Sequence, residues 1–107
     1  MRLKMLLALA LAFPLSSARS ETLVQSGREI ATTFCSRCHA IGPSGESPNP
    51  KSPPFRLLSK KYPLSDLQEA LGEGIVVGHE GSEMPPFVFS TEQIRALLSY
   101  LESIQRK

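Results

Sequence analysis

The chain lacks the features that would place it in several common classes of protein. It has 107 residues, which leaves room for one small domain, and it contains no tryptophan and only two cysteines. Its longest apolar run, Met5–Phe13, is less than half of the about 20 residues that a membrane-spanning helix needs. The β-prone residues 75–77 form too short a run to predict a strand. The sequence therefore predicts neither a transmembrane span nor a sheet protein.

The first twenty residues differ from the rest and have the pattern of a secretory signal peptide. A basic start and the apolar stretch Met5–Phe13 are followed by Pro14 and by small residues up to Ala18. Small residues at this place are what a signal peptidase accepts. We therefore predict a cleaved signal peptide over residues 1–20 and a single exported domain over residues 21–107.

A strong charge of either sign is missing once this leader is removed. The full chain has 12 Lys and Arg against 10 Asp and Glu. Arg2, Lys4 and Arg19 lie in the leader, which leaves nine basic against ten acidic residues. Because no basic stripe remains, the composition argues against nucleic acid as a partner.

The exported domain is also too small to be stabilised comfortably by its core alone. Domains of this size are usually reinforced by a disulfide, a metal or a cofactor. Cys35 and Cys38 lie in the sequence FCSRCHAIG, and His39 follows the second cysteine directly. Three kinds of chemistry suit such a motif: a redox disulfide, half of a zinc site, and covalent attachment of a c-type haem.

Three stretches of the sequence have the periodicity of amphipathic helices. The first runs from about Thr22 to the cysteines. The second is short, with Ser65 as its N-cap and Gln68 as the capping-box partner, and the third begins with a capping box of Ser90 and Gln93. The apolar positions are Leu23, Gly27, Ile30 and Phe34 in the first stretch, Leu67, Ala70 and Leu71 in the second, and Ile94, Leu97, Leu98, Leu101 and Ile104 in the third. With the Gly- and Pro-rich loops between them, these stretches predict an all-α fold.

The surroundings of the two cysteines disfavour the first two kinds of chemistry. A thioredoxin-like motif follows a strand in a βαβ unit, and no such unit is predicted here. A zinc ion needs about four ligands, for which Cys35, Cys38, His39 and His79 are the candidates. The side chains of adjacent residues such as Cys38 and His39 are difficult to direct at one tetrahedral ion.

Attachment of a c-type haem accounts for every residue of the motif. Two thiols at i and i+3 on a helical turn can form thioethers with the two vinyl groups on one side of a porphyrin. The histidine that follows then lies beneath the ring, and the pattern Cys-x-x-Cys-His is the signature of this attachment. We therefore predict that Cys35 and Cys38 bind one haem c covalently and that His39 is an axial ligand of its iron.

The sixth position of the iron needs a second ligand or stays open. Met84 is the only methionine outside the leader, and it precedes Pro85 and Pro86, whose rings restrict the backbone. A lone methionine usually fills a core, but Met84 lies in a polar, Gly- and Pro-rich loop away from any apolar stripe. His79 is a second candidate, and an open site is the third possibility.

Residues 21–107 resemble a class I cytochrome c, one of the small monohaem electron carriers of the periplasm and of mitochondria. The motifs that carry the resemblance are CSRCH near the start, the stretch SPPF, the Met-Pro loop and the closing amphipathic helix. The resemblance implies a small all-α fold in which the first and last helices cross and the loops wrap the covalent haem. It also implies Met84, rather than His79, as the second axial ligand.

The resemblance further implies two contacts between distant residues. Gly27 and Tyr100 match the small residue and the aromatic residue through which the first and last helices pack. Pro53 or Pro54 matches the proline whose carbonyl accepts a hydrogen bond from the haem histidine, which makes the imidazole a better ligand. The lysine ring through which mitochondrial members dock is not evident in this sequence.

The implied function is that of a periplasmic one-electron carrier and not of an enzyme. The iron cycles between Fe(III) and Fe(II) with both ligands bound, and a thioether sulfur favours the reduced state. Implied partners are redox proteins such as dehydrogenases or terminal oxidases. Two alternatives stay open: a haem-based ligand-binding or sensing protein, which a labile sixth position would favour, and a small cytochrome subunit of a larger oxidoreductase.

Overall fold

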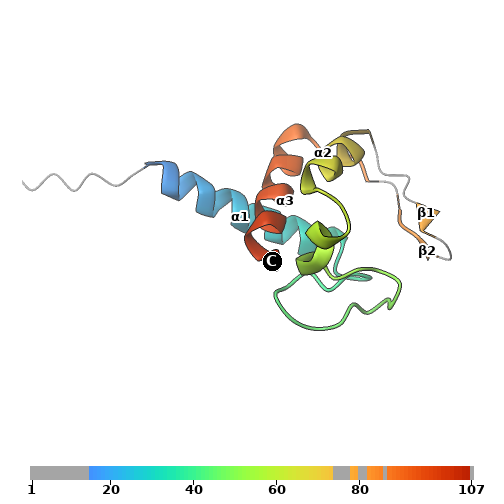
Figure 1. Ribbon diagram of the computed structural model, residues 1–107. Helices are drawn as coiled ribbons and strands as arrows, with labels where there is room; N and C mark the ends of the chain where they lie inside the picture. Colours follow the sequence, from blue (N-terminus) through green and yellow to red (C-terminus); the bar gives the residue numbers. More distant parts are fainter. Residues whose placement is uncertain (1–14, 74–77, 80–81, 86, 107) are drawn as a thin grey trace, which may run out of the picture.

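The regular secondary structure of the described residues is almost entirely helical, and loops connect the helices (Figure 1). The elements are α1 (Leu15–Phe34), the 3₁₀ helix η1 (Phe55–Lys60), α2 (Leu64–Glu73), β1 (Gly78–His79), β2 (Ser82–Glu83) and α3 (Thr91–Ile104). The computed structural model describes residues 15–73, 78–79, 82–85 and 87–106, and of residues 15–20, 78–79 and 82–83 the backbone alone. Strands β1 and β2 form a two-residue antiparallel ladder. The prediction of an all-α fold is confirmed, with this ladder as its only addition in the described residues.

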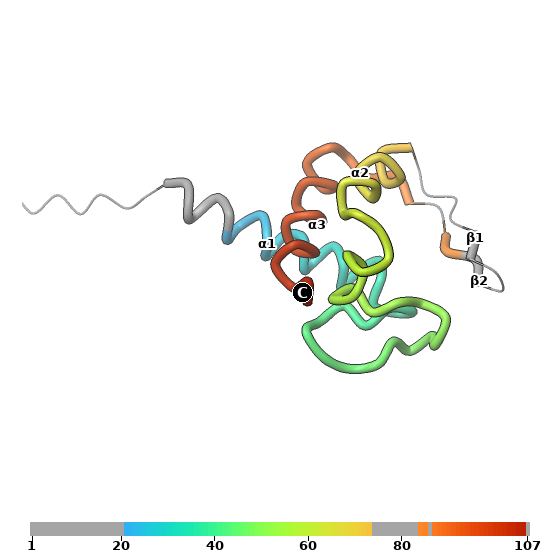
Figure 2. The backbone as a smooth tube through the Cα atoms, in the orientation of Figure 1, coloured from blue at the N-terminus to red at the C-terminus, as the bar shows by residue number. Residues whose placement is uncertain are grey.

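Helices α1 and α3 cross (Figure 2). At Gly27 their backbones are too close to admit a side chain. A Cβ atom on Gly27 would lie 2.6 Å from the carbonyl carbon of Ala96 and 2.7 Å from Cβ of Tyr100. One turn further along α1, Ala31 is completely buried in the core. The predicted contact between the first and last helices through Gly27 and Tyr100 is therefore confirmed.

Helix α3 begins and packs as its sequence predicts. The Ser90 hydroxyl accepts a hydrogen bond from the Gln93 amide at 3.1 Å, and the Gln93 side chain accepts one from the Ser90 amide at 2.8 Å. This reciprocal pair satisfies two backbone donors that the first turn of a helix leaves without partners. The apolar stripe contributes the buried residues Ile94, Leu97 and Leu101 and the partly buried residues Leu98 and Ile104.

Two helix starts differ from the predicted positions. Helix α1 begins at Leu15 instead of about Thr22, since alanine and arginine at positions 18 and 19 are strong helix formers. Helix α2 begins at Leu64, so that Ser65 lies inside the first turn and its prediction as the N-cap was wrong. Pro63, whose ring fixes φ, precedes the helix, and its carbonyl accepts a hydrogen bond from the Asp66 amide at 3.0 Å.

The long segment between α1 and η1 contains no helix or strand (Figure 2). Hydrogen bonds connect it to the cysteine motif. The Ser47 hydroxyl accepts from the Ala40 amide at 2.9 Å. The Asn49 amide donates to the Cys38 carbonyl at 3.1 Å. These bonds hold the segment against the cysteine motif. They thereby place the residues that follow the segment next to His39.

The Tyr100 hydroxyl links α3 to this segment by donating to the Ile41 carbonyl at 2.6 Å. We expect Tyr100→Phe to lower the free energy of unfolding by about 1 kcal/mol, because the partly buried Ile41 carbonyl loses its partner while the ring stays packed. Thermal unfolding followed by circular dichroism measures the change. Ser99→Ala is the control, since Ser99 donates only to Arg95 of its own helix. Equal unfolding temperatures for the two variants would contradict the expectation.

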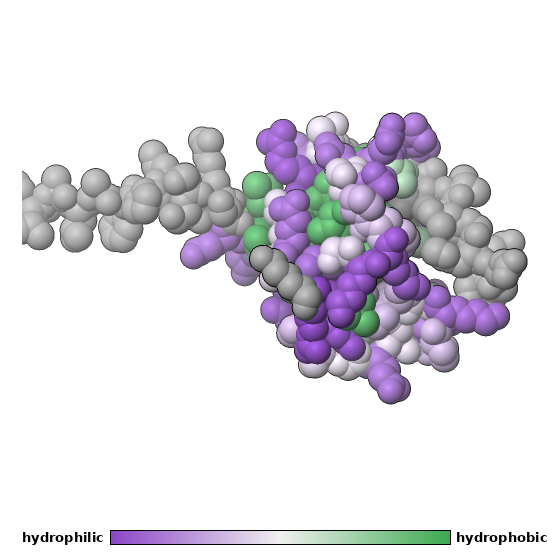
Figure 3. All heavy atoms as spheres, viewed as in Figure 1, coloured by the Kyte–Doolittle hydropathy of each residue, from purple (hydrophilic) through white to green (hydrophobic). Residues whose placement is uncertain are grey.

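The surface of the described residues is mainly polar in the view of Figure 3, with apolar side chains showing only in small areas between polar ones. Lys51, Lys60 and Lys61 are exposed, whereas the Arg56 guanidinium donates to the Gly45 carbonyl at 2.7 Å. In the described ranges, no helix combines the length and the apolar character that crossing a membrane requires.

Candidate functional site

The two cysteines lie on a turn that continues directly from the end of α1. The Cys35 amide donates to the Ala31 carbonyl at 2.9 Å, and the His39 amide donates to the Cys35 carbonyl at 2.9 Å. The backbone thus keeps an almost helical course through the motif, which brings residues at i and i+3 to the same side. Cys35 and His39 are buried, and Cys38 is half-buried.

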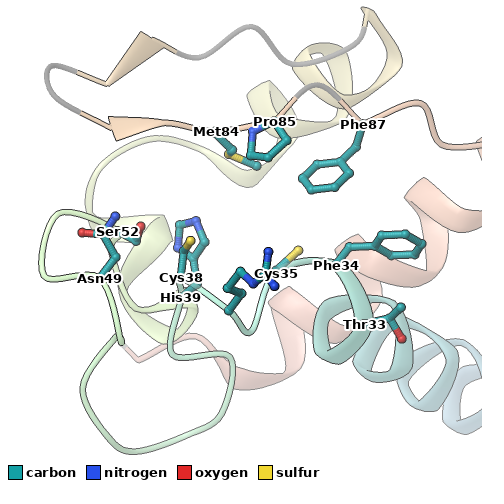
Figure 4. Close-up of a pocket in the computed structure, with 11 residues that line it drawn as sticks. Thr33, Phe34, Cys35, Cys38, His39, Asn49, Ser52, Met84, Pro85 and Phe87 are labelled. Atoms are coloured by element: carbon teal, nitrogen blue, oxygen red, sulfur yellow. The ribbon is translucent and has the colours of Figure 1, made fainter.

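A cavity of about 370 Å³ separates this turn from the segment that follows β2 (Figure 4). Its walls include Cys35, Cys38 and His39 on one side and Met84, Pro85 and Phe87 on the other. A smaller cavity of about 70 Å³ shares four of these residues, Cys35, His39, Met84 and Phe87, and extends into the apolar core. The four residues predicted to hold the cofactor, Cys35, Cys38, His39 and Met84, therefore face one space although Met84 is far from the others in sequence.

The His39 ring is held in one orientation by contacts on two sides. Its Nδ1 atom lies 2.8 Å from the Pro53 carbonyl oxygen, which can only accept, so Nδ1 carries the proton and donates. This tautomer leaves the lone pair that metal ligation requires on Nε2. The Phe55 ring packs against the imidazole at a centroid distance of 4.8 Å. Of the two prolines predicted to support His39, the structure places Pro53 in this role.

Met84 reaches the cavity from a segment with no regular secondary structure. It is half-buried, packs against the hydrophobic core and lines both cavities. The alternative ligand His79 lies in β1, and its side chain is outside the described part of the chain. The structure thus places Met84 across the cavity from the cysteine motif.

Three phenylalanines form an aromatic cluster beside the cavity that the sequence alone did not predict. The ring of Phe34 packs edge-on against Phe87 at 5.8 Å and against Phe89 at 5.5 Å, measured between centroids. Phe34 was predicted on the packed face of the first helix, yet it is 43% exposed because it lies at the edge of the cavity. The sequence FVF after the Met-Pro sequence is the signal that could have predicted this, because alternate residues of an extended segment, here Phe87 and Phe89, face the same side.

The Cys35 thiol lies in apolar surroundings that suit a neutral sulfur. Burial raises the pKa of Cys35 to about 11, because the charged thiolate loses its hydration there. A thioether carries no charge and is compatible with this position, whereas a metal-bound thiolate would have to be desolvated. Among the described residues, no cluster of three or more Cys, His, Asp or Glu side chains is arranged to hold a metal ion. The residues present therefore fit a covalently bound porphyrin better than a thiolate metal site.

A small helical domain whose CSRCH turn faces a methionine across a cavity has the architecture of a protein that binds haem covalently. The chain matches the family model for cytochrome c over residues 24–105, and it belongs to the cytochrome c family. Members of this family bind haem c covalently and carry electrons, so haem c with its iron is the cofactor and redox proteins are the partners in general. No curated protein and no solved structure matches the chain significantly.

Proposed function

We propose that the protein is a periplasmic one-electron carrier of the class I type and not an enzyme. In this proposal Cys35 and Cys38 form the two thioethers, and His39 and Met84 are the axial ligands. The observation that carries the proposal is the single cavity lined by all four side chains. When bound, haem c supplies one-electron chemistry at its iron.

The residues around the cavity explain how a carrier would work with little rearrangement. Pro53 holds the His39 imidazole in one orientation, and the core packs against Met84 on the other side of the cavity. Both side chains would thus stay in place when the oxidation state of the iron changes, and apolar side chains such as Phe87 would reduce the access of water. An iron held by both His39 and Met84 would have no open position for a substrate, which favours a carrier over an enzyme or a sensor.

The proposed location depends on the signal peptide over residues 1–20. Cleavage after Ser20 would remove the first turns of α1 and would leave residues 21–34 in that helix. Gly27 lies well inside the remaining part, so the crossing with α3 does not need the leader. Export is therefore compatible with a complete cytochrome domain over residues 21–107.

Intact mass spectrometry of the exported protein tests attachment and cleavage together. We expect the mass of residues 21–107 plus one haem, and we expect acid–acetone to leave the colour on the polypeptide. Cys35→Ala or Cys38→Ala should remove most of the holoprotein, because each variant loses one of the two thioethers. Ser36→Ala is the matched control, since Ser36 lies between the cysteines but its hydroxyl donates only to the Thr32 carbonyl.

Haem attachment and leader cleavage would each be refuted by a different result of this experiment. A mass equal to the bare polypeptide, or colour that acid–acetone extracts completely, would show that no haem is bound covalently. An exported protein whose N-terminal sequence begins at or before Lys4 would refute cleavage of the leader but leave the haem site intact.

A further inference from the structure

One side chain at the end of α3, that of Gln105, joins this helix to the segment that supports His39. Its Nε2 atom donates to the Phe55 carbonyl at 2.6 Å and to the Leu101 carbonyl at 2.9 Å, and its Oε1 atom accepts from the Ser59 amide at 2.8 Å. The amide can satisfy all three partners only in this orientation, because two of them accept and one donates. Gln105 thus bonds to the first residue of η1 and to a residue of its last turn.

Phe55, the first of these partners, is also in direct contact with the residues around the candidate axial histidine. Its amide donates to the carbonyl of Ala40, the residue after His39, at 2.9 Å. Its ring packs against the His39 imidazole, and Pro53, whose carbonyl accepts from His39 Nδ1, lies two residues before it. Phe55 is 6% exposed. A displacement of its backbone would therefore disturb the contacts that hold His39.

We propose that Gln105 is a positioning residue for His39. By holding the Phe55 carbonyl, it keeps the Pro53 carbonyl within hydrogen-bonding distance of His39 Nδ1. The backbone of the following residue supports this arrangement, since the Arg106 amide donates to the Arg56 carbonyl at 3.0 Å. The proposal rests on the proposed function, because it requires His39 to be an axial ligand.

The alternative role for Gln105 is that of a helix cap, since its bond to Leu101 satisfies a carbonyl of the last turn of α3. The two roles predict different effects on the reduction potential. A hydrogen bond from Nδ1 makes the imidazole a stronger donor and favours Fe(III), so weakening that bond raises the potential. A general loosening of the fold that admits water favours the more highly charged Fe(III) state and therefore lowers the reduction potential. The sign of the change therefore distinguishes positioning from loss of a cap.

The test uses the exported holoprotein and the variant Gln105→Met, which keeps the length of the side chain but makes none of the three hydrogen bonds. We expect the reduction potential to rise in spectroelectrochemical titration. We also expect hydrogen exchange of the Phe55 amide, followed by NMR, to become about tenfold faster. Ser103→Ala is the matched control at the same end of α3, because Ser103 donates only to the Tyr100 carbonyl. It should change neither quantity.

An unchanged or lowered potential in Gln105→Met would overturn the positioning role, even if exchange at Phe55 becomes faster. If this variant does not accumulate, Gln105→Leu replaces it. Leucine is neutral and also makes none of the three hydrogen bonds, so the same rise in potential is expected. Wild-type protein without covalent haem would instead refute the proposed function, so the two failures are distinguishable.

Discussion

Gly27→Ala is expected to lower the free energy of unfolding by about 3 kcal/mol, an effect at the upper end for overpacking of a core. The added methyl group would meet the backbone carbonyl of Ala96 and Cβ of Tyr100. Neither atom can rotate away, so α1 and α3 would have to separate along their crossing. For a domain of this size, such a loss corresponds to a decrease in Tm of more than about 10 °C, which calorimetry of the holoprotein measures.

Gly72→Ala is the matched control, because it adds the same methyl group to a helical glycine with open space around it. Apart from its chain neighbours and the backbone of its own helix, no described residue has an atom within 4 Å of the Cβ position at Gly72. Alanine is preferred to glycine inside a helix by about 0.5–1 kcal/mol, so this variant should be at least as stable as the wild type. If the two variants had similar Tm values, the close approach of α1 and α3 at Gly27 would be refuted.

The sequence predicted those parts of the fold and site that depend on local patterns. The capping box at Ser90 and Gln93 involves residues three positions apart, so its residue types alone indicate the start of α3. The motif from Cys35 to His39 likewise lies on one turn. Even the contact of Gly27 with α3 was predictable, because the family resemblance supplied the pairing.

Other contacts between distant segments could not be predicted from the sequence. Pro53 and Pro54 are adjacent and chemically identical, and only the path of the chain decides which carbonyl reaches His39. Gln105 is one polar residue near the end of an amphipathic helix, and nothing local connects it with Phe55. The start of α2 was missed for a different reason, because Pro63 begins the turn and the N-cap signal at Ser65 is not used.

Met84→Ala is expected to change the ligation of the bound haem and to leave its covalent attachment at Cys35 and Cys38 intact. Met84 is half-buried against the core and lies across the cavity from His39, and no other described residue outside the CSRCH motif offers sulfur there. The oxidised wild type should show the weak sulfur-to-iron charge-transfer band at the near-infrared edge, and the variant should lose it. The variant should also bind carbon monoxide readily in the reduced state, because alanine no longer blocks the second axial position.

The reduction potential supplies an independent measurement of the same change. It should fall in Met84→Ala, since a thioether stabilises Fe(II) and its loss removes that preference. Met84→His should also lower the potential, but it should keep carbon monoxide out because a second strong ligand is restored. Val88→Ala is the control from the same segment, as Val88 is 94% exposed and does not line the cavity. It should alter neither the band nor the potential.

His79→Ala decides between the two candidate ligands. If Met84 is the ligand, this variant should keep the charge-transfer band and exclude carbon monoxide like the wild type. Loss of the band in His79→Ala, or immediate uptake of carbon monoxide by the reduced wild type, would contradict ligation by Met84. The first result would indicate ligation by histidine, and the second an open site suited to ligand binding. In both cases the covalent attachment at Cys35 and Cys38 would be unaffected, because it depends on the two cysteine thiols and not on the sixth ligand.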